Sequence, residues 1–167
     1  LNLGININKI KKALNKFLGI QRRFTKIFSI GNREFYDDYA HHPTEIRAVI
    51  KSARQVNKER KIICVFQPHR YSRVKFLKNE FANSFGLSNQ VVLCPVYSAG
   101  EKIKYNFNQH NFSKLIAEKS NIQVINIQNQ KELENYFKKN LISDEMVICM
   151  GAGSISNWIR EIGEKYK

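Results

Sequence analysis

The stretch DDYAHHPTEI, residues 37–46, places two carboxylates, a tyrosine and two histidines within one short segment. A metal site needs several converging ligands, and Asp38, His41 and His42 could supply some of them. Adjacent histidines in a loop tend to point apart, and no cysteine is near. We therefore expect no metal site here, and we predict that Asp38 and His41 contact a substrate or a nucleotide.

The second half of this stretch has the pattern of a helix start. Pro43 suits the first helical position, and Glu45 falls in the first turn, where the helix dipole favours a carboxylate. We expect His42, beside Pro43, to cap a helix rather than to bind a ligand.

A second polar cluster, QPHRYSR at residues 67–73, carries two arginines three residues apart at an expected helix start. Arg70 and Arg73 can therefore face one direction. Guanidinium groups bind carboxylates and phosphates through paired hydrogen bonds, and a helix N-terminus adds to the attraction for an anion. This pattern, together with the neighbouring His69, predicts an anion-binding role.

The turn GAGS at residues 151–154 resembles a shortened phosphate-binding turn, although tight packing between a strand and a helix explains its glycines equally well. The sequence has no GxxxxGK[ST] motif, so it carries no P-loop.

Apolar runs alternate with amphipathic segments along the chain. The runs predict strands at 27–30, 34–36, 61–66, 91–96, 122–127 and 146–150. The amphipathic segments predict helices at 7–18, 43–56, 72–85, 112–119, 131–139 and from 155 onward. Strands that are apolar on both faces favour an α/β fold, with a mostly parallel sheet and helices on both faces.

In open α/β sheets, ligands bind beyond the carboxyl ends of the strands. Four loops follow expected strands at that edge, and they hold most of the unusual polar residues: 38–44, 67–73, 97–102 and 151–154. We expect these loops to form the functional site.

The net charge of +14 over 167 residues suits anionic substrates such as nucleotides, and it also suits a nucleic acid. No basic stripe is interleaved with aromatic residues, so we expect no nucleic-acid partner. No apolar run is long enough to span a membrane, and we expect no membrane partner. The three cysteines, Cys64, Cys94 and Cys149, lie in apolar runs, which predicts reduced core residues and a cytoplasmic location.

Four motifs, in this order and spacing, resemble the C-terminal domain of the Mur ligases of peptidoglycan synthesis: DDYAHHPTEI, FQPHRYSR, VYSAGEK and MGAGSIS. GIQRRF, at residues 19–24, resembles the junction between the family's central ATPase domain and that domain. The resemblance implies a Rossmann-like C-terminal domain at residues 25–167. It also implies that residues 1–24 are the end of the central domain and a linker.

The resemblance implies an ATP-dependent ligase that uses magnesium and forms ADP. Within the family, the motifs are most similar to those of members that join L-alanine to UDP-N-acetylmuramate through an acyl phosphate. In such enzymes other domains hold the UDP-sugar and the P-loop. We therefore expect that this chain has no ligase activity alone, and that the metal is held mainly outside it and by ATP.

By resemblance, Arg23 and Asp38 match positions that contact the nucleotide. The matched amino-acid-binding positions are Tyr39, His41, Arg70 and Arg73. His41 is the candidate catalytic residue, either by hydrogen bonding the substrate or by moving a proton. Two features depart from the family pattern: Ser154 stands where an acid is frequent, and residues 103–112 lack the expected proline and glycine.

Two alternatives stay open. A related ligase that recycles murein tripeptide shares a similar first motif, but its second motif is expected to read like EPRSNT rather than QPHRYSR. The chain could also be a non-catalytic module that binds a nucleotide or a nucleic acid.

Overall fold

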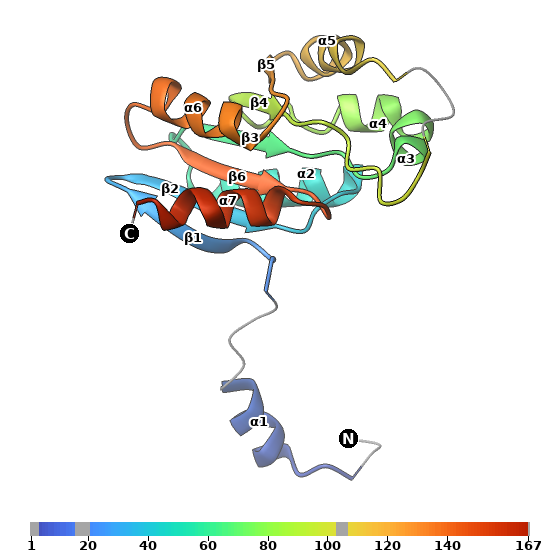
Figure 1. The fold of residues 1–167 in the computed structure, drawn as a ribbon. Coiled ribbons are helices and arrows are strands. Elements are labelled where there is room, and N and C mark those ends of the chain that lie inside the picture. The colour runs from blue at the N-terminus through green and yellow to red at the C-terminus, as the bar shows by residue number, and fades with distance from the viewer. Residues whose placement is uncertain (1–3, 16–20, 103–106, 167) are drawn as a thin grey trace.

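The computed structural model of the chain describes residues 4–15, 21–102 and 107–166. Six strands form one sheet in the order β1-β2-β6-β3-β4-β5 (Figure 1). Strand β1 is antiparallel to β2, and the other neighbours are parallel. The strands are β1 (Thr25–Ile30), β2 (Arg33–Asp38), β3 (Ile62–Phe66), β4 (Gln90–Leu93), β5 (Gln123–Asn126) and β6 (Met146–Met150).

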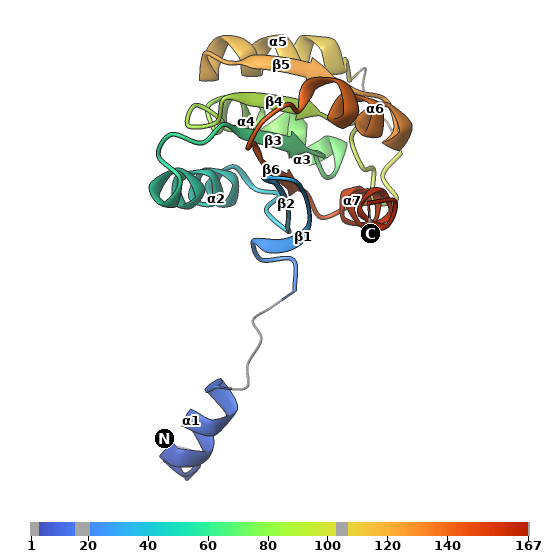
Figure 2. The same cartoon turned by 90° about the vertical axis from the view of Figure 1, so that its left-hand side faces the viewer.

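Helices cover both faces of the sheet, as the apolar strands predict. One core includes side chains of α2, α3, α4 and α5, and the other includes those of α6 and α7. Figure 2 shows α2 on one side of the sheet and α6 and α7 on the other. The helices are α1 (Ile7–Asn15), α2 (Pro43–Val56), α3 (Tyr71–Phe76), α4 (Lys78–Ala82), α5 (Gln109–Ser120), α6 (Gln130–Asn140) and α7 (Ile155–Glu164).

The alternation of side chains along a strand divides the central strand between the two cores. Ile62, Cys64 and Phe66 of β3 belong to the core under α2, whereas Ile63 and Val65 belong to the core under α6 and α7. This is the period-two geometry of a strand with both faces buried. The predicted α/β fold is confirmed.

The three cysteines are buried and free. Burial raises the pKa of the Cys64 thiol to about 12 and raises the pKa values of Cys94 and Cys149 as well. They therefore behave as apolar core residues, in agreement with their apolar sequence context.

Two predicted elements were wrong in their extent. The helix expected at 72–85 is two short helices, because Leu77 departs from helical geometry with φ −110° and ψ 23°. The strand expected at 91–96 ends at Leu93, and Pro95 cannot donate a hydrogen bond that would extend the ladder.

Other bounds differ by a few residues. Helix α5 starts earlier than expected because the Asn108 side chain accepts a hydrogen bond from the Asn111 N–H at 2.9 Å. Helix α1 covers the first part of the helix expected at 7–18, and the remainder lies outside the described residues together with Gly19. No helix of the described part of the chain is long and apolar enough to cross a membrane.

The predicted cap of α2 is confirmed. The His42 ring accepts a hydrogen bond from the Thr44 N–H at 3.4 Å, and Pro43 is the first residue of the helix. The Glu45 carboxylate accepts from the N–H groups of His41 at 2.9 Å and His42 at 3.1 Å. This reciprocal arrangement is a capping box, and it fixes the loop between β2 and α2.

The sheet order brings the carboxyl ends of β2, β6, β3 and β4 side by side. Backbone hydrogen bonds continue beyond the strands, from Gly151 N to Asp38 O at 3.2 Å and from Gln67 N to Met150 O at 2.9 Å. After β6 the chain turns to α7 on one face, whereas after β2 and β3 it turns to the opposite face. Such a reversal marks the part of a sheet edge where α/β proteins bind ligands.

Candidate functional site

Gln67, at the end of β3, joins the β3 loop to the 151–154 turn. The residue is 3% exposed; its Nε2 donates to Ser154 Oγ at 3.0 Å, and its Oε1 accepts from the Ile155 N–H at 3.0 Å. Gln67 thereby caps the start of α7. The sequence reasoning missed this residue, although it lies in the QPHRYSR motif.

The glycines of the turn are explained by packing. Gly151 has φ +152°, and a Cβ there would lie 2.8 Å from Gln67 O. A Cβ at Gly153 would lie 2.5 Å from both Gln67 Oε1 and a ring atom of Tyr97. Of the two explanations that the sequence left open, a phosphate-binding turn and tight packing, the structure favours packing, and most of the close neighbours belong to the loops at Gln67 and Tyr97.

Asp38 fixes the segment before β1 against the end of β2. Its carboxylate accepts hydrogen bonds from Phe24 N at 2.8 Å and Ala40 N at 2.7 Å, and the residue is 2% exposed. Burial raises the pKa of Asp38, against the opposing effects of these N–H groups and of the Arg23 charge. Arg23 is exposed and close enough to act on Asp38. Contact of either residue with a nucleotide stays a prediction.

Four rings from three loops form a row along the sheet edge. The ring centroids of Tyr39 and His41 are 5.1 Å apart, those of His41 and His69 are 5.8 Å apart, and those of His69 and Tyr97 are 5.6 Å apart. Tyr39 and Tyr97, at the two ends of the row, are 37% and 41% exposed. The predicted residues Tyr39 and His41 therefore lie together, beside a histidine from the next motif.

The His41 ring is held in one orientation. Its Nδ1 lies 2.9 Å from Tyr39 O and 3.4 Å from a carboxylate oxygen of Glu45. A carbonyl oxygen only accepts, so this hydrogen bond requires a proton on Nδ1 and leaves Nε2 for a ligand. Burial acts to raise the pKa of Glu45, but the N–H groups of His41 and His42 and the His41 charge outweigh it and lower that pKa.

His69 is partly buried between the other rings. Burial lowers its pKa, and the charges of Arg73, His41 and Arg70 lower it further. Its Nδ1 is buried and has no hydrogen-bond partner among the described residues. The neutral form of the His69 ring is therefore favoured beside these cations. The same cations would attract an anionic ligand.

Arg70 and Arg73 flank the start of α3. Arg70 is exposed and has φ +70°, an unusual value for a residue with a Cβ, and its N–H donates to Tyr97 O at 2.8 Å. Arg73 is partly buried, and its Nη1 has no hydrogen-bond partner within the part of the chain that the structure describes. A buried guanidinium N–H without a partner is a group that a ligand carboxylate could satisfy.

The α3 N-terminus, where the sequence predicts an attraction for an anion, already binds a carboxylate of the chain itself. The Glu101 carboxylate accepts from Ser72 N at 3.1 Å and also from the Ser72 hydroxyl. These hydrogen bonds lower the pKa of Glu101. The Glu101 carboxylate therefore occupies the helix terminus, and the arginine side chains are the groups left to bind a ligand there.

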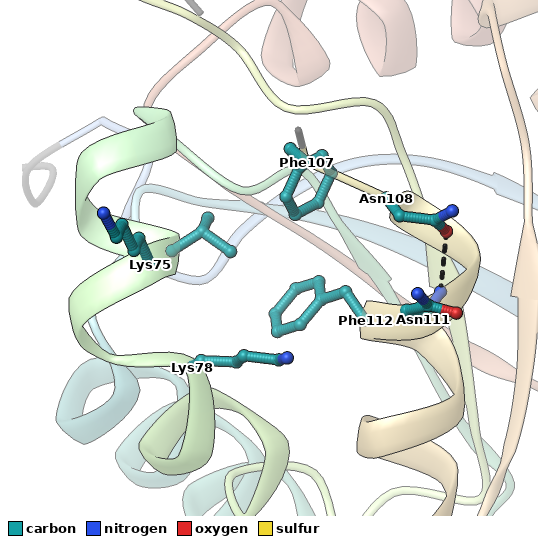
Figure 3. Close-up of a pocket in the computed structure, with 7 residues that line it drawn as sticks. Lys75, Lys78, Phe107, Asn108, Asn111 and Phe112 are labelled. Carbon is teal, nitrogen blue, oxygen red and sulfur yellow. Dashed lines mark hydrogen bonds between the residues drawn. The ribbon is translucent and has the colours of Figure 1, made fainter. Parts of the chain in front are cut away.

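A separate cavity of about 190 Å³ lies between α3, α4 and α5. Figure 3 shows Lys75 and Lys78 on one side of it and Phe107, Asn108 and Phe112 on the other. None of the six predicted site residues lines it. Among the described residues, no group of three or more His, Cys, Asp or Glu side chains is arranged to hold a metal ion.

Comparison with known proteins gives a family match over most of the chain. Residues 22–153 match the family model described as "Mur ligase, glutamate ligase domain". The UDP-N-acetylmuramate–L-alanine ligase of Pelagibacter ubique is 48% identical over 98% of the chain. The ligase of the same name from Fusobacterium nucleatum is 38% identical over 97% of the chain. The chain spans 35% and 36% of the length of these relatives.

Solved structures agree on the fold. The UDP-N-acetylmuramate–alanine ligase of Thermotoga maritima superposes with a TM-score of 0.70 at 29% identity, over 99% of this chain and 34% of that one. A murein peptide ligase from Psychrobacter arcticus gives a TM-score of 0.72 at 17% identity, over 96% of this chain and 33% of that one, which shows the fold alone.

Proposed function

Because the chain belongs to the Mur ligase family, as the match of residues 22–153 to its glutamate ligase domain shows, we propose that it supplies the amino-acid-binding residues and part of the nucleotide site of an ATP-dependent ligase. The acceptor is L-alanine, and the donor is UDP-N-acetylmuramate. Two relatives that bear this activity in their names, with 48% and 38% identity, support this choice. The QPHRYSR motif supports it over the tripeptide-recycling alternative.

The proposed chemistry proceeds through an acyl phosphate. ATP phosphorylates the carboxylate of UDP-N-acetylmuramate, and the amine of L-alanine attacks the resulting acyl phosphate. The ADP is formed in the first of these steps, and the tetrahedral intermediate of the second step collapses to the amide and phosphate. The task of this chain is to orient the amine, which is catalysis by positioning.

Arg70 and Arg73 bind the carboxylate of L-alanine, so that its amine points away from them toward the acyl phosphate. Cationic groups at this position also stabilise negative charge that develops on the intermediate. His41 presents Nε2 to the substrate, either as a hydrogen-bond acceptor for the amine or as the group that takes its proton. Tyr39 contacts the substrate beside His41.

Arg23 and Asp38 are assigned to the nucleotide. The Asp38 carboxylate already accepts two backbone hydrogen bonds, and each oxygen keeps a lone pair for a ribose hydroxyl. No carboxylate cluster in the described part of the chain fits Mg²⁺. We therefore assign no step of this chain to the metal, which ATP would bring with it.

The single observation that carries this proposal is the meeting of the two specific motifs. The 5.8 Å contact between His41 and His69 places the β2 loop beside the β3 loop. Arg73, four residues after His69, has a buried Nη1 without a protein partner among the described residues. An amino-acid carboxylate supplies the acceptor that this group lacks.

The proposal is tested in a chimera in which this chain replaces the matching third of the Pelagibacter ubique relative. We expect phosphate release that depends on ATP, UDP-N-acetylmuramate and L-alanine, with L-alanine preferred over murein tripeptide by at least about tenfold. A preference for the tripeptide would assign the recycling activity instead. No acceptor-dependent release, while the parent enzyme is active, would reject the ligase proposal. The chain by itself is expected to release no phosphate.

A further inference from the structure

Arg22, which no prediction included, connects its own segment to two other parts of the site. Its Nη2 donates to the Gly151 carbonyl at 2.6 Å, and its guanidinium lies over the Tyr39 ring, 4.7 Å from the centroid. Its own carbonyl accepts from the Tyr39 N–H at 2.8 Å. One side chain and its backbone thus connect the segment before β1, the β2 loop and the β6 turn.

The Arg22 guanidinium is in turn held by a buried carboxylate. Asp37 is fully buried, and its Oδ2 lies 3.6 Å from Arg22 Nε. The same oxygen accepts from Ser156 Oγ at 2.6 Å and from Arg160 Nη2 at 3.1 Å, both on α7. Asp37 therefore has a cation on each side: Arg160 of α7, which donates a hydrogen bond to it, and Arg22, which lies at ion-pair distance.

The backbone of this segment also has dihedral angles that are unfavourable without supporting contacts. Arg22 has φ +60° and Phe24 has φ +49°. Residues with a Cβ seldom adopt such values, and they persist where surrounding contacts over-determine them. The Phe24 N–H bond to Asp38 and the three Arg22 contacts provide those constraints.

We infer that Arg22 is a positioning residue that couples the nucleotide subsite to the amino-acid subsite. This inference rests on the proposed function. The segment that carries Arg23 and binds Asp38 also fixes, through Arg22, the ring of Tyr39 and the turn at Gly151. The amino-acid-binding residue Tyr39 is therefore held in place only while the segment with Arg22 and Arg23 lies against the end of β2. Arg22 acts through Tyr39 and does not itself touch substrate.

The kinetic test uses the chimera described above. Arg22→Gln removes the charge and the planar group over Tyr39, and we expect KM for L-alanine to rise by about tenfold, with KM for UDP-N-acetylmuramate unchanged. Arg22→Lys keeps the ion pair with Asp37 and should recover part of the loss. The matched control is Arg160→Gln, which removes the other cation of Asp37 but leaves Tyr39 untouched.

We expect Arg160→Gln to leave KM for L-alanine within about twofold of the unmodified chimera. If both variants raise KM equally, the role of Arg22 is only to neutralise Asp37, and the inference is wrong. If Arg22→Gln leaves KM unchanged, the coupling does not exist.

A second measurement does not depend on ligase activity. In the 167-residue chain, the ring protons of Tyr39 are followed by NMR. Arg22→Gln should shift these resonances and weaken the cross-peaks between the Tyr39 and His41 rings, whereas Arg160→Gln should not. If the chimera uses no L-alanine but these shifts occur, the ligase proposal fails and the positioning role stands. Unchanged cross-peaks in Arg22→Gln would overturn the positioning role.

Discussion

Gly151 lies where a side chain meets two obstacles at once. Its φ of +152° lies outside the range that residues with a Cβ adopt readily, and the atom nearest to an added Cβ is a backbone oxygen, which cannot rotate away. We expect Gly151→Ala to lower the free energy of unfolding by at least about 2 kcal/mol. Urea denaturation followed by the fluorescence of Trp158 measures this loss.

Gly31→Ala is the matched control for this prediction. Gly31 has φ +57°, and no atom lies within 4 Å of an added Cβ. Its cost is therefore only the left-handed backbone penalty of about 1 kcal/mol. Equal losses in the two variants would show that the contact with Gln67 does not constrain the turn.

Glu34, near the N-terminal end of β2, makes the free energy of unfolding depend on pH. Hydrogen bonds from Lys26, and then from Arg60, hold its pKa at about 2, against an ordinary value of 4.5. An acid whose pKa is lowered in the folded state stabilises the protein above its unfolded pKa, and this stabilisation is lost as the pH falls from about 4.5 to about 2.

We therefore expect Glu34→Gln to reduce the free energy of unfolding by about 2 kcal/mol at pH 7, after allowance for the partial exposure of the pair. The difference between the two proteins should nearly vanish at pH 2. Parallel urea titrations at both pH values measure it, and a difference that is independent of pH would contradict the assignment.

The sequence was enough to select the residues that could do chemistry, but not the residues that hold them in place. Tyr39, His41 and Arg73 stand in motifs whose composition is unusual for turns. Gln67 and Arg22 have common roles in surface loops, and only the fold reveals that their side chains cross to Ser154 and Gly151. Such contacts join residues more than 80 positions apart in the chain, and local sequence contains no signal for them.

At the scale of elements, α2 was predicted to its observed bounds because its start has several agreeing signals. The His42 cap is the one that a substitution can isolate. We expect His42→Ala to lower the free energy of unfolding by about 1 kcal/mol, whereas His42→Asn, which retains a side-chain acceptor, should lose less than half of that. Equal destabilisation by both substitutions would place the contribution elsewhere than in the cap.

Helices α3 and α4 show the limit of such reasoning. The apolar spacing of Val74, Phe81 and Phe85 fits one continuous helix, and all three are buried. No proline or glycine near Leu77 marks this break in the sequence. Tertiary packing of α4 against α5 accompanies this break, and a pattern of apolar residues does not distinguish one bent helical segment from two short ones.

At the scale of the whole molecule, the alternation of strands and helices predicted a mostly parallel sheet, and the motifs predicted which edge binds ligands. The position of β6 between β2 and β3 was not predictable from alternation, because it depends on a long return from β5 across the sheet. That insertion is what brings the 151–154 turn between the two histidine-bearing loops.

The central claim is that Arg73, with Arg70, binds the carboxylate of the amino-acid acceptor. It is tested most directly by comparing L-alanine with L-alaninamide, which lacks that carboxylate, in the chimera and in its Arg73→Gln variant. We predict that the substitution lowers kcat/KM for L-alanine by at least about a hundredfold and leaves the slow reaction of L-alaninamide nearly unchanged. An equal loss for both acceptors would contradict the claim.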